Sequence, residues 1–272
     1  MRVVCVGDCG VDHYLPSGEL LVGGITANFA RHARHVFPAG DEISIVSCVG
    51  SDPGADLVLS SLEGSQIDCQ ITRLPGTTPV QYIRIEPDGE RSFVRYEEGV
   101  LRDFRFSEQQ RQIIAASDLM VAPVYLQIAG LFDDLMSVST RGKVAIDFAD
   151  ILQHPDVSLL EEHIDRIDIG FFGLATENAE TATRIGELAA RHSKLFVVTL
   201  GADGCHVYRG SERFETRAVP VNAVIDTTGA GDAFAAGFLS RYCHGASVPA
   251  SAAYGATLAA RVIGYIGSYR PD

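Results

Sequence analysis

The apolar residues of this chain recur in short runs rich in β-branched side chains, which alternate with longer segments of helical period. A continuous apolar run is typical of a strand buried on both faces of a parallel sheet, and apolar positions repeating every three to four residues are typical of the helices that cover one. Strands are predicted at residues 2–6, 43–49, 119–122, 143–148, 167–172 and 195–200. Helices are predicted at residues 25–37, 53–62, 108–116, 126–138, 178–192, 232–242 and 249–263.

The alternation predicts βαβ crossovers and an α/β fold, with a mostly parallel central sheet flanked by helices, in one domain over residues 1–272. Two stretches break the rhythm, and in the second Asp88 and Gly89 form a turn signal between two alternating β-runs, which predicts a hairpin. We expect these stretches, about 12–24 and 78–98, to form a small sheet that acts as a lid over a ligand. The alternative is an edge hairpin with no lid role.

Composition narrows the classes of function. The formal net charge of −13 repels polyanions and anionic membranes, so neither nucleic acid nor a membrane is expected as a partner. No apolar run approaches the roughly 20 residues that a membrane span needs. Met1 leads directly into the first apolar run without a basic leader, so a cytoplasmic protein that acts on a small molecule is expected.

Lysine occurs only at Lys143 and Lys194. Any phosphate chemistry must therefore rely on arginine, metal ions or backbone N–H groups. The sequence contains no G-x-x-x-x-G-K-[ST] segment, which excludes a P-loop.

A glycine-rich turn supplies suitable backbone donors. Gly229, Ala230 and Gly231 open a helix of small residues, and the first N–H groups of a helix lack intrahelical acceptors and lie at the positive end of its dipole. Asp232 follows at once and would repel a phosphate, so it is a candidate for accepting a proton from the nucleophile. The alternative is an ordinary helix-capping aspartate.

The nonamer DTTGAGDAF at 226–234 resembles the signature of ribokinase (PfkB) family sugar and nucleoside kinases. The resemblance extends from residue 2 to about residue 269, and it implies a three-layer ribokinase-like fold with a small β-sheet lid. It also implies that Asp232 is the catalytic base and that Gly229, Ala230 and Gly231 form the anion hole. The implied activity is transfer of the γ-phosphoryl group of ATP to a primary hydroxyl of a sugar or sugar derivative.

A second element of the resemblance lies near the N-terminus. Gly23 and Gly24, followed by Asn28, resemble the family's G-G-x-x-x-N element, and Asp12 in GDCGVD matches the aspartate that precedes it. These four residues are implied to bind the sugar. Without the resemblance, Asp12 is a turn residue and Asn28 a polar residue at a helix start.

Two further elements imply a nucleotide and magnesium site. Thr199, Gly201 and Gly204 in TLGADG resemble the family's nucleotide-site turn. Glu177 and Glu180 match its N-x-x-E element, which organises magnesium and the triphosphate, but Glu177 stands where the family usually has Asn. Acidic residues also favour a helix start without any metal, so that alternative stays open.

Asp226 and Thr228, with the late turn near Gly267, match positions that hold a monovalent cation in several relatives, so K⁺ is a candidate. Homodimers formed through the lid are also common in relatives. Within the family, the segments 97–101, 146–150 and 259–269 most resemble kinases of fructosamines such as fructoselysine.

Two other functions stay open. A non-catalytic sugar or nucleotide sensor on the same fold is compatible with the unusual Glu177. A nicotinamide oxidoreductase is suggested by the βα start at 3–12, although the segment from Gly7 to Gly10 lacks the G-x-G-x-x-G spacing.

Overall fold

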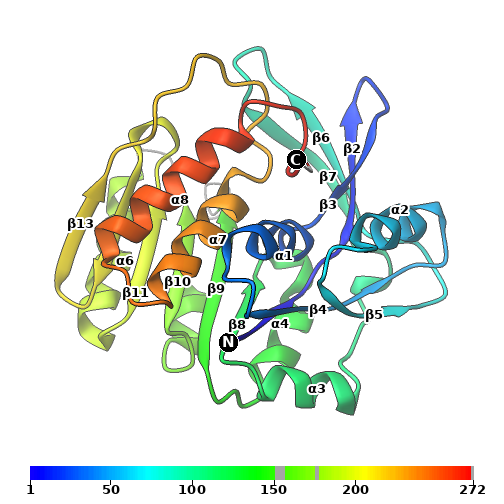
Figure 1. Cartoon of the computed structure of the whole chain (residues 1–272), viewed down its shortest axis with the longest axis horizontal. Helices are drawn as coiled ribbons and strands as arrows, with labels where there is room; N and C mark the ends of the chain where they lie inside the picture. The colour runs from blue at the N-terminus through cyan, green and yellow to red at the C-terminus, as the bar shows by residue number, and fades with distance from the viewer. Residues whose placement is uncertain (151–156, 175–177, 271–272) are drawn as a thin grey trace.

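A computed structural model describes residues 1–150, 157–174 and 178–270 of the chain. Within these residues a nine-stranded sheet has the order β13-β12-β11-β10-β9-β8-β1-β4-β5 (Figure 1). Its strands are parallel from β11 to β5, and β12 and β13 are antiparallel. The bounds are β1 Arg2–Val6, β4 Glu42–Val49, β5 Asp68–Arg73, β8 Leu119–Pro123, β9 Lys143–Asp150, β10 Ile169–Gly173, β11 Leu195–Thr199, β12 Cys205–Arg209 and β13 Glu212–Thr216.

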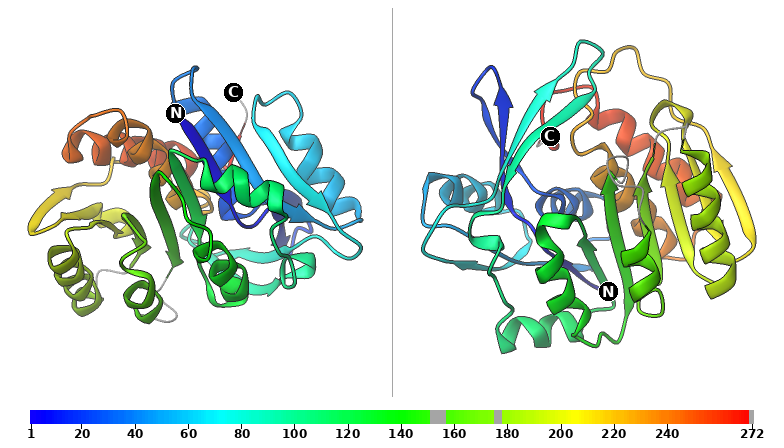
Figure 2. Two further views of the ribbon diagram at one scale, coloured as in Figure 1. Left: turned by 90° about the horizontal axis from the view of Figure 1, so that it is seen from below. Right: turned by 180° about the vertical axis from the view of Figure 1, so that it is seen from behind.

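The apolar strands face two separate cores. On β1, Val3 and Cys5 pack on one face of the sheet and Val4 and Val6 on the other, because successive side chains of a strand point in opposite directions. One face is covered by α1 Ile25–Val36, α2 Pro53–Leu62, α7 Ala230–Tyr242 and α8 Val248–Val262. The other face is covered by α3 Glu108–Ala115, α4 Ala129–Met136, α5 Ser158–His163 and α6 Ala179–His192 (Figure 2).

The two stretches that break the α/β rhythm form a second sheet of four strands. Its order is β3-β2-β6-β7, with bounds β2 Gly10–Leu15, β3 Leu20–Gly23, β6 Val80–Ile85 and β7 Arg91–Glu97. The predicted hairpin is confirmed, since β6 and β7 pair antiparallel and the N–H of Gly89 donates to the carbonyl of Glu86 at 2.9 Å. We call this second sheet the lid sheet after the role predicted for it; it rises beyond one end of the large sheet (Figure 2).

Several bounds differ from the sequence predictions. The helix predicted to start at residue 232 starts at Ala230, because Gly229 caps it in a left-handed conformation with φ 77°. The helix predicted at 126–138 is divided into a 3₁₀ turn, Leu126–Ile128, and α4. The pattern missed β5, β13 and α5. No helix of the described residues is long and apolar enough to span a bilayer.

Candidate active site

The starts of α1 and α7 meet at Asp232. The two helices pack against each other, and the side chain of Asp232 is only 7% exposed. Its Oδ2 accepts a 2.9 Å hydrogen bond from Nδ2 of Asn28, a residue 204 positions away. Two residues that the sequence assigned to separate elements therefore share one site.

The other end of the Asn28 amide is also engaged. Its Oδ1 accepts a 2.6 Å hydrogen bond from the hydroxyl of Ser268, which is 1% exposed and follows α8. The sequence motifs did not single out Ser268. Nothing in its local pattern indicates that it meets α1, because the contact depends on how the C-terminal turn folds back onto the core.

The first turn of α7 has unpaired backbone donors. Ala230 donates its N–H to the carbonyl of Thr227 at 3.3 Å, but none of the described residues accepts from the N–H of Gly231 or Asp232. A Cβ at Gly229 would lie 2.5 Å from the Cβ of Ser268, so only glycine allows the C-terminal turn to approach this closely. A Cβ at Gly231 would meet no atom within 4 Å, so these donors border open space.

Two further carboxyl groups, those of Asp147 and Asp8, act on Asp232, and Asp8 also acts on Asp147 and Asp12. Burial, followed by the charge of Asp147, raises the pKa of Asp232 well above its usual range, and the hydrogen bond from Asn28 opposes that rise. Burial raises the pKa of Asp147 to about 6. Burial, together with the charges of Asp8 and Asp226, raises the pKa of Asp12 to about 7. Without a ligand, the site therefore disfavours several negative charges at once.

Asp8 lies two residues after β1, and its carboxylate accepts hydrogen bonds from the first N–H groups of α1. Its Oδ2 accepts from the N–H of Ile25 at 3.1 Å and from the hydroxyl of Tyr125 at 3.1 Å, and its Oδ1 accepts from the N–H of Thr26 at 3.2 Å. The hydroxyl oxygen of Tyr125 in turn accepts from the hydroxyl of Tyr96 on β7, at 3.0 Å, because Tyr125 gives its single hydroxyl proton to Asp8. The sequence analysis did not single out Asp8, although its place at the carboxyl end of a core strand was a usable signal.

A β-bulge shapes the face that the lid sheet turns toward the core. The pairing of β6 with β7 shifts between Tyr82 and Ile83, which leaves Val94 as an extra residue. Because such a residue reverses the alternation beyond it, Arg91 and Tyr96 both reach core partners despite their odd spacing.

Arg91 joins the lid sheet to the turn before α7. Its Nη1 donates to the carbonyl of Thr227 at 3.3 Å and to Oγ1 of Thr227 at 3.2 Å. The tip of the same hairpin also touches this turn, since the N–H of Thr227 donates to the carbonyl of Gly89 at 3.2 Å. The positive charge of Arg91 lowers the pKa of Asp232, partly offsetting the neighbouring carboxylates.

Asp12 lies on β2 and is 4% exposed. Its carboxylate packs over Gly23 on the neighbouring strand, where a Cβ would lie 2.1 Å from Oδ1, and Gly24 caps α1. No described residue donates a hydrogen bond to this carboxylate. It is therefore a buried acceptor with no hydrogen-bond donor in the part of the chain that the structure describes.

The residues expected to hold a monovalent cation do come together. Asp226 is fully buried, and its Oδ2 accepts from the hydroxyl of Tyr14 at 2.7 Å and from the N–H of Gly267 at 2.8 Å. Its Oδ1 accepts from the N–H of Thr228 at 2.8 Å. The Oγ1 of Thr228 is buried without a hydrogen-bond partner among the described residues.

Comparison with known proteins decides the family. Residues 2–272 match the pfkB family carbohydrate kinase. The chain belongs to this family. It is 29% identical to fructoselysine 6-kinase of Escherichia coli (strain K12), over 97% of this chain and 98% of that protein. Two solved structures share the fold of this pfkB kinase. Adenosine kinase from Sinorhizobium meliloti aligns with a TM-score of 0.85 at 24% identity, over 99% of this chain and 95% of that chain. Arabidopsis thaliana ribokinase complexed with ribose and ATP aligns with a TM-score of 0.77 at 20% identity, over 98% of this chain and 93% of that chain.

The predicted ribokinase-like fold and the predicted enzyme class are both confirmed. The pfkB kinase is a phosphotransferase with an alcohol group as acceptor.

The remaining sequence-predicted residues of the pfkB kinase lie on other elements. Thr199 ends β11, and the hydrogen bond from the N–H of Leu200 to the carbonyl of Gly204, at 2.8 Å, closes the exposed turn that contains Gly201. Glu177 lies outside the described residues.

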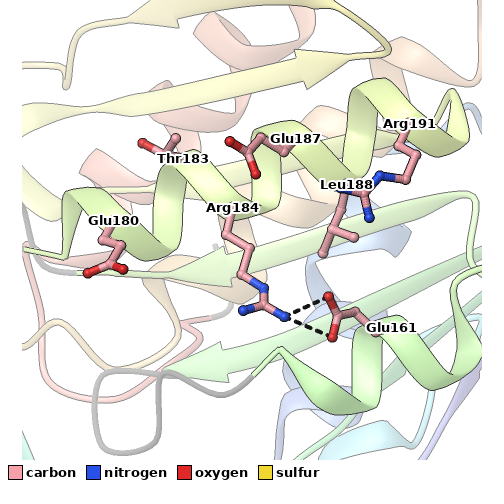
Figure 3. A pocket seen from close by; sticks show the side chains of 7 residues that line it. All are labelled: Glu161, Glu180, Thr183, Arg184, Glu187, Leu188 and Arg191. Atoms are coloured by element: carbon pink, nitrogen blue, oxygen red, sulfur yellow. Dashed lines mark hydrogen bonds and ion pairs between the residues drawn. The ribbon is translucent and has the colours of Figure 1, made fainter.

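Glu180 is exposed in the first turn of α6. It borders a surface hollow on α5 and α6 that contains none of the carboxyl groups around Asp232; the lining residues are Glu161, Glu180, Thr183, Arg184, Glu187, Leu188 and Arg191 (Figure 3). Arg184 donates to both carboxylate oxygens of Glu161 there, at 2.8 and 3.0 Å. The described residues contain no cluster of three or more His, Cys, Asp or Glu side chains that could hold a metal ion.

Proposed function

We propose that this pfkB kinase transfers the γ-phosphoryl group of ATP to a primary hydroxyl of a sugar or sugar derivative, with Asp232 as the general base. The observation that carries the proposal is the buried carboxyl of Asp232 next to the unpaired N–H groups of Gly231 and Asp232. These donors, at the positive end of α7, would stabilise charge on the transferring group. Asp232 would take the hydroxyl proton late in a loose transition state, and in-line positioning would supply much of the rate.

Asp12 and Asn28 are the proposed sugar ligands, and Gly23 and Gly24 are proposed to border the sugar, with Gly23 leaving room for the carboxylate of Asp12. Asp12 supports this role because its buried carboxylate has no donor among the described residues, and a vicinal hydroxyl would supply one. One N–H of the Asn28 amide points to Asp232. The second N–H is left for a hydroxyl of the substrate.

A fructosamine such as fructoselysine is the proposed acceptor. Fructoselysine 6-kinase is similar over nearly the whole chain. A fructosamine also carries an amine that is protonated at neutral pH, and Asp8, Asp12 and Asp147 gather where the substrate would bind. A cation among carboxyl groups that repel one another relieves that repulsion.

Thr199, Gly201 and Gly204 are proposed to border the nucleotide, since their turn lies at the carboxyl end of β11, where ligands of open α/β sheets bind. Glu180 is proposed to bind magnesium, because magnesium usually keeps several waters and binds one or two carboxylates plus substrate phosphates, and the carboxylate of Glu180 is exposed. When bound, it would neutralise phosphate charge. K⁺ would be held by oxygens of Asp226 and Thr228, and the unpartnered Oγ1 of Thr228 supports this assignment.

A homodimer through the lid sheets is also proposed. Leu20, Phe93 and Val94 on lid strands are 52%, 41% and 47% exposed, and apolar side chains on a small sheet favour burial against a second sheet. Light scattering that finds only monomers at micromolar concentration would reject the dimer.

The proposed function is tested by ADP release from ATP and magnesium with a panel of acceptors. The panel contains fructosamines, fructose, ribose, ketodeoxygluconate and nucleosides, and Asp232→Asn serves as the control. Turnover with a fructosamine that greatly exceeds turnover with the others supports the proposal. Binding of an acceptor without turnover on any member would favour a sensor instead.

A further inference from the structure

A chain of two hydrogen bonds ends on Asp232. The hydroxyl of Ser268 donates to Oδ1 of Asn28 at 2.6 Å, and Nδ2 of Asn28 donates to Oδ2 of Asp232 at 2.9 Å. The three residues are 1%, 4% and 7% exposed, so water does not compete strongly for these contacts. Ser268 does not reach Asp232 itself, and any effect it has must pass through the amide.

The orientation of the Asn28 amide follows from the different hydrogen-bonding capacities of its two ends. An asparagine amide has a donor end and an acceptor end, and Ser268 gives the acceptor end a partner on the side away from Asp232. Turning the amide over would place Oδ1 against an ionised carboxylate, so that two acceptors would face each other in a buried site. The Ser268 hydroxyl therefore favours the orientation in which Asn28 donates to Asp232.

The backbone on both sides of Ser268 is held in place. The N–H of Gly267 donates to Asp226 at 2.8 Å, and Nε2 of His32 lies 2.9 Å from the carbonyl of Ser268. Burial lowers the pKa of His32 to about 4, so its ring is neutral near pH 7 and can donate this hydrogen bond. These contacts hold the Ser268 hydroxyl in place relative to the amide of Asn28.

We propose that Ser268 is a positioning residue which, through the amide of Asn28, keeps Asp232 ionised and oriented to receive the substrate proton. This inference rests on the proposed function of Asp232 as a general base. It adds a residue to which the sequence analysis assigned no role.

The charges around Asp232 show why its ionised form needs a stabilising hydrogen bond. Asp147 on β9 and Asp8 after β1 oppose its ionisation, and Arg91 on β7 favours it. On α1, His32 is the titratable group next to Ser268. On α8, Gly255 and Leu258 pack on Phe234 and Gly237 of α7, and the titratable Tyr254 packs on Arg241 near the other end of α7. The hydrogen bond from Asn28 is therefore one of two local contacts that favour the carboxylate.

The test compares wild type with Ser268→Ala by two readouts. The acidic limb of the pH profile of kcat/KM should move up by roughly 0.5 to 1 unit, with activity approaching wild type above that limb. Independently of turnover, the infrared carbonyl band of protonated Asp232, assigned by its loss in Asp232→Asn, should titrate at a pH higher by the same amount. If wild type phosphorylates no acceptor, the proposed function fails, and the infrared titration still decides this inference.

Ser251→Ala is the matched control, because Ser251 is a fully buried serine of α8 whose hydroxyl bonds to the carbonyl of Ser247 and not to Asn28. It should leave both readouts unchanged. Ser268→Cys keeps the shape of the side chain with a slightly larger atom and a weaker donor, and should give a smaller shift in the same direction. This variant also provides the readout if Ser268→Ala does not fold.

A double variant tests the route through Asn28. In an Asn28→Ala background, Ser268→Ala should produce no further shift in the titration of Asp232, because the intermediary is gone. An unchanged titration in folded Ser268→Ala would overturn the inference. An equal shift with and without Asn28 would do the same, since it would show that Ser268 acts by another route.

Discussion

The hydroxyl of Tyr14 donates a 2.7 Å hydrogen bond to Oδ2 of Asp226, which joins the lid sheet to the turn before α7 across 212 positions of sequence. Both side chains are buried, with exposures of 4% and 0%. The contact makes the position of β2 depend on the same carboxylate that holds Gly267 and Thr228.

Replacing Tyr14 by Phe should therefore destabilise the fold. A buried carboxylate that loses one donor costs about 1 to 3 kcal/mol in the free energy of unfolding. Urea denaturation would measure it. Tyr82→Phe is the control, because the Tyr82 hydroxyl makes only a long, exposed contact of 3.5 Å to Glu97, and its effect should stay below about 0.5 kcal/mol. Equal losses in the two variants would contradict the structural role of the Tyr14 contact.

Asp232→Asn should lower kcat by roughly 10²-fold to 10⁴-fold, the range for losing a general base. The affinity for ATP should change little, because the backbone donors of α7 remain. Steady-state kinetics and a nucleotide titration measure the two quantities. Wild-type turnover in this variant would refute the assignment of Asp232.

Alanine substitutions at the two glycines that start α7 should have different effects, one on stability and the other on activity. Gly229→Ala forces a Cβ to within 2.6 Å of the Cα of Ser268 in a backbone conformation with φ 77°, and should cost about 2 to 4 kcal/mol. The methyl group of Gly231→Ala meets open space. This variant should therefore be as stable as wild type, or more stable by up to about 1 kcal/mol in the free energy of unfolding, because alanine has the higher helix propensity.

The methyl group of Gly231→Ala would nevertheless occupy the space proposed for phosphate. This variant should raise KM for ATP or lower kcat while thermal unfolding stays near wild type. Full activity in a stable Gly231→Ala protein would argue against phosphate at these donors.

Arg91→Gln should make activity more sensitive to acid. Arg91 lowers the pKa values of Asp232, Asp147 and Asp12, so its loss raises them and leaves less ionised base at low pH. We expect kcat/KM at pH 6 to fall roughly 3-fold to 10-fold more than at pH 8. Arg91→Lys retains the charge and should preserve the wild-type profile. Equal losses at both pH values in Arg91→Gln would point to a purely steric role.

Asp12→Asn should change how stability depends on pH. The pKa of Asp12 is raised from its ordinary 3.8 to about 7, so between these values the folded chain binds more protons than the unfolded chain. Wild type therefore loses stability from this group as pH rises through about 7.

The Asp12→Asn variant lacks that loss and should gain roughly 1 to 4 kcal/mol relative to wild type between about pH 4 and pH 8. Denaturant titrations at several pH values measure it. Asp103→Asn, at an exposed carboxyl, serves as the control. A constant difference between Asp12→Asn and wild type across this range would contradict the buried, proton-binding state of Asp12.

Local pattern was sufficient for much of the fold. The apolar runs at β1 and β4 predict buried parallel strands because each residue faces one of two cores. Local pattern did not predict β13, an edge strand whose residues are all partly or fully exposed. Edge strands carry polar residues, and these hide the period-two pattern of apolar positions. The short α5 was missed because its 6 residues are too few to show a helical period.

The sequence by itself determined the family, the glycine-rich start of α7 and the place of Asp232 within it, since each depends on residues adjacent in the chain. Only the tertiary structure decided what surrounds Asp232. Asn28 comes from α1, Ser268 from the turn after α8, and Arg91 from a lid strand whose bulge sets its direction. A side-chain contact between residues more than two hundred positions apart depends on helix packing and strand register, and neither is encoded in any short segment.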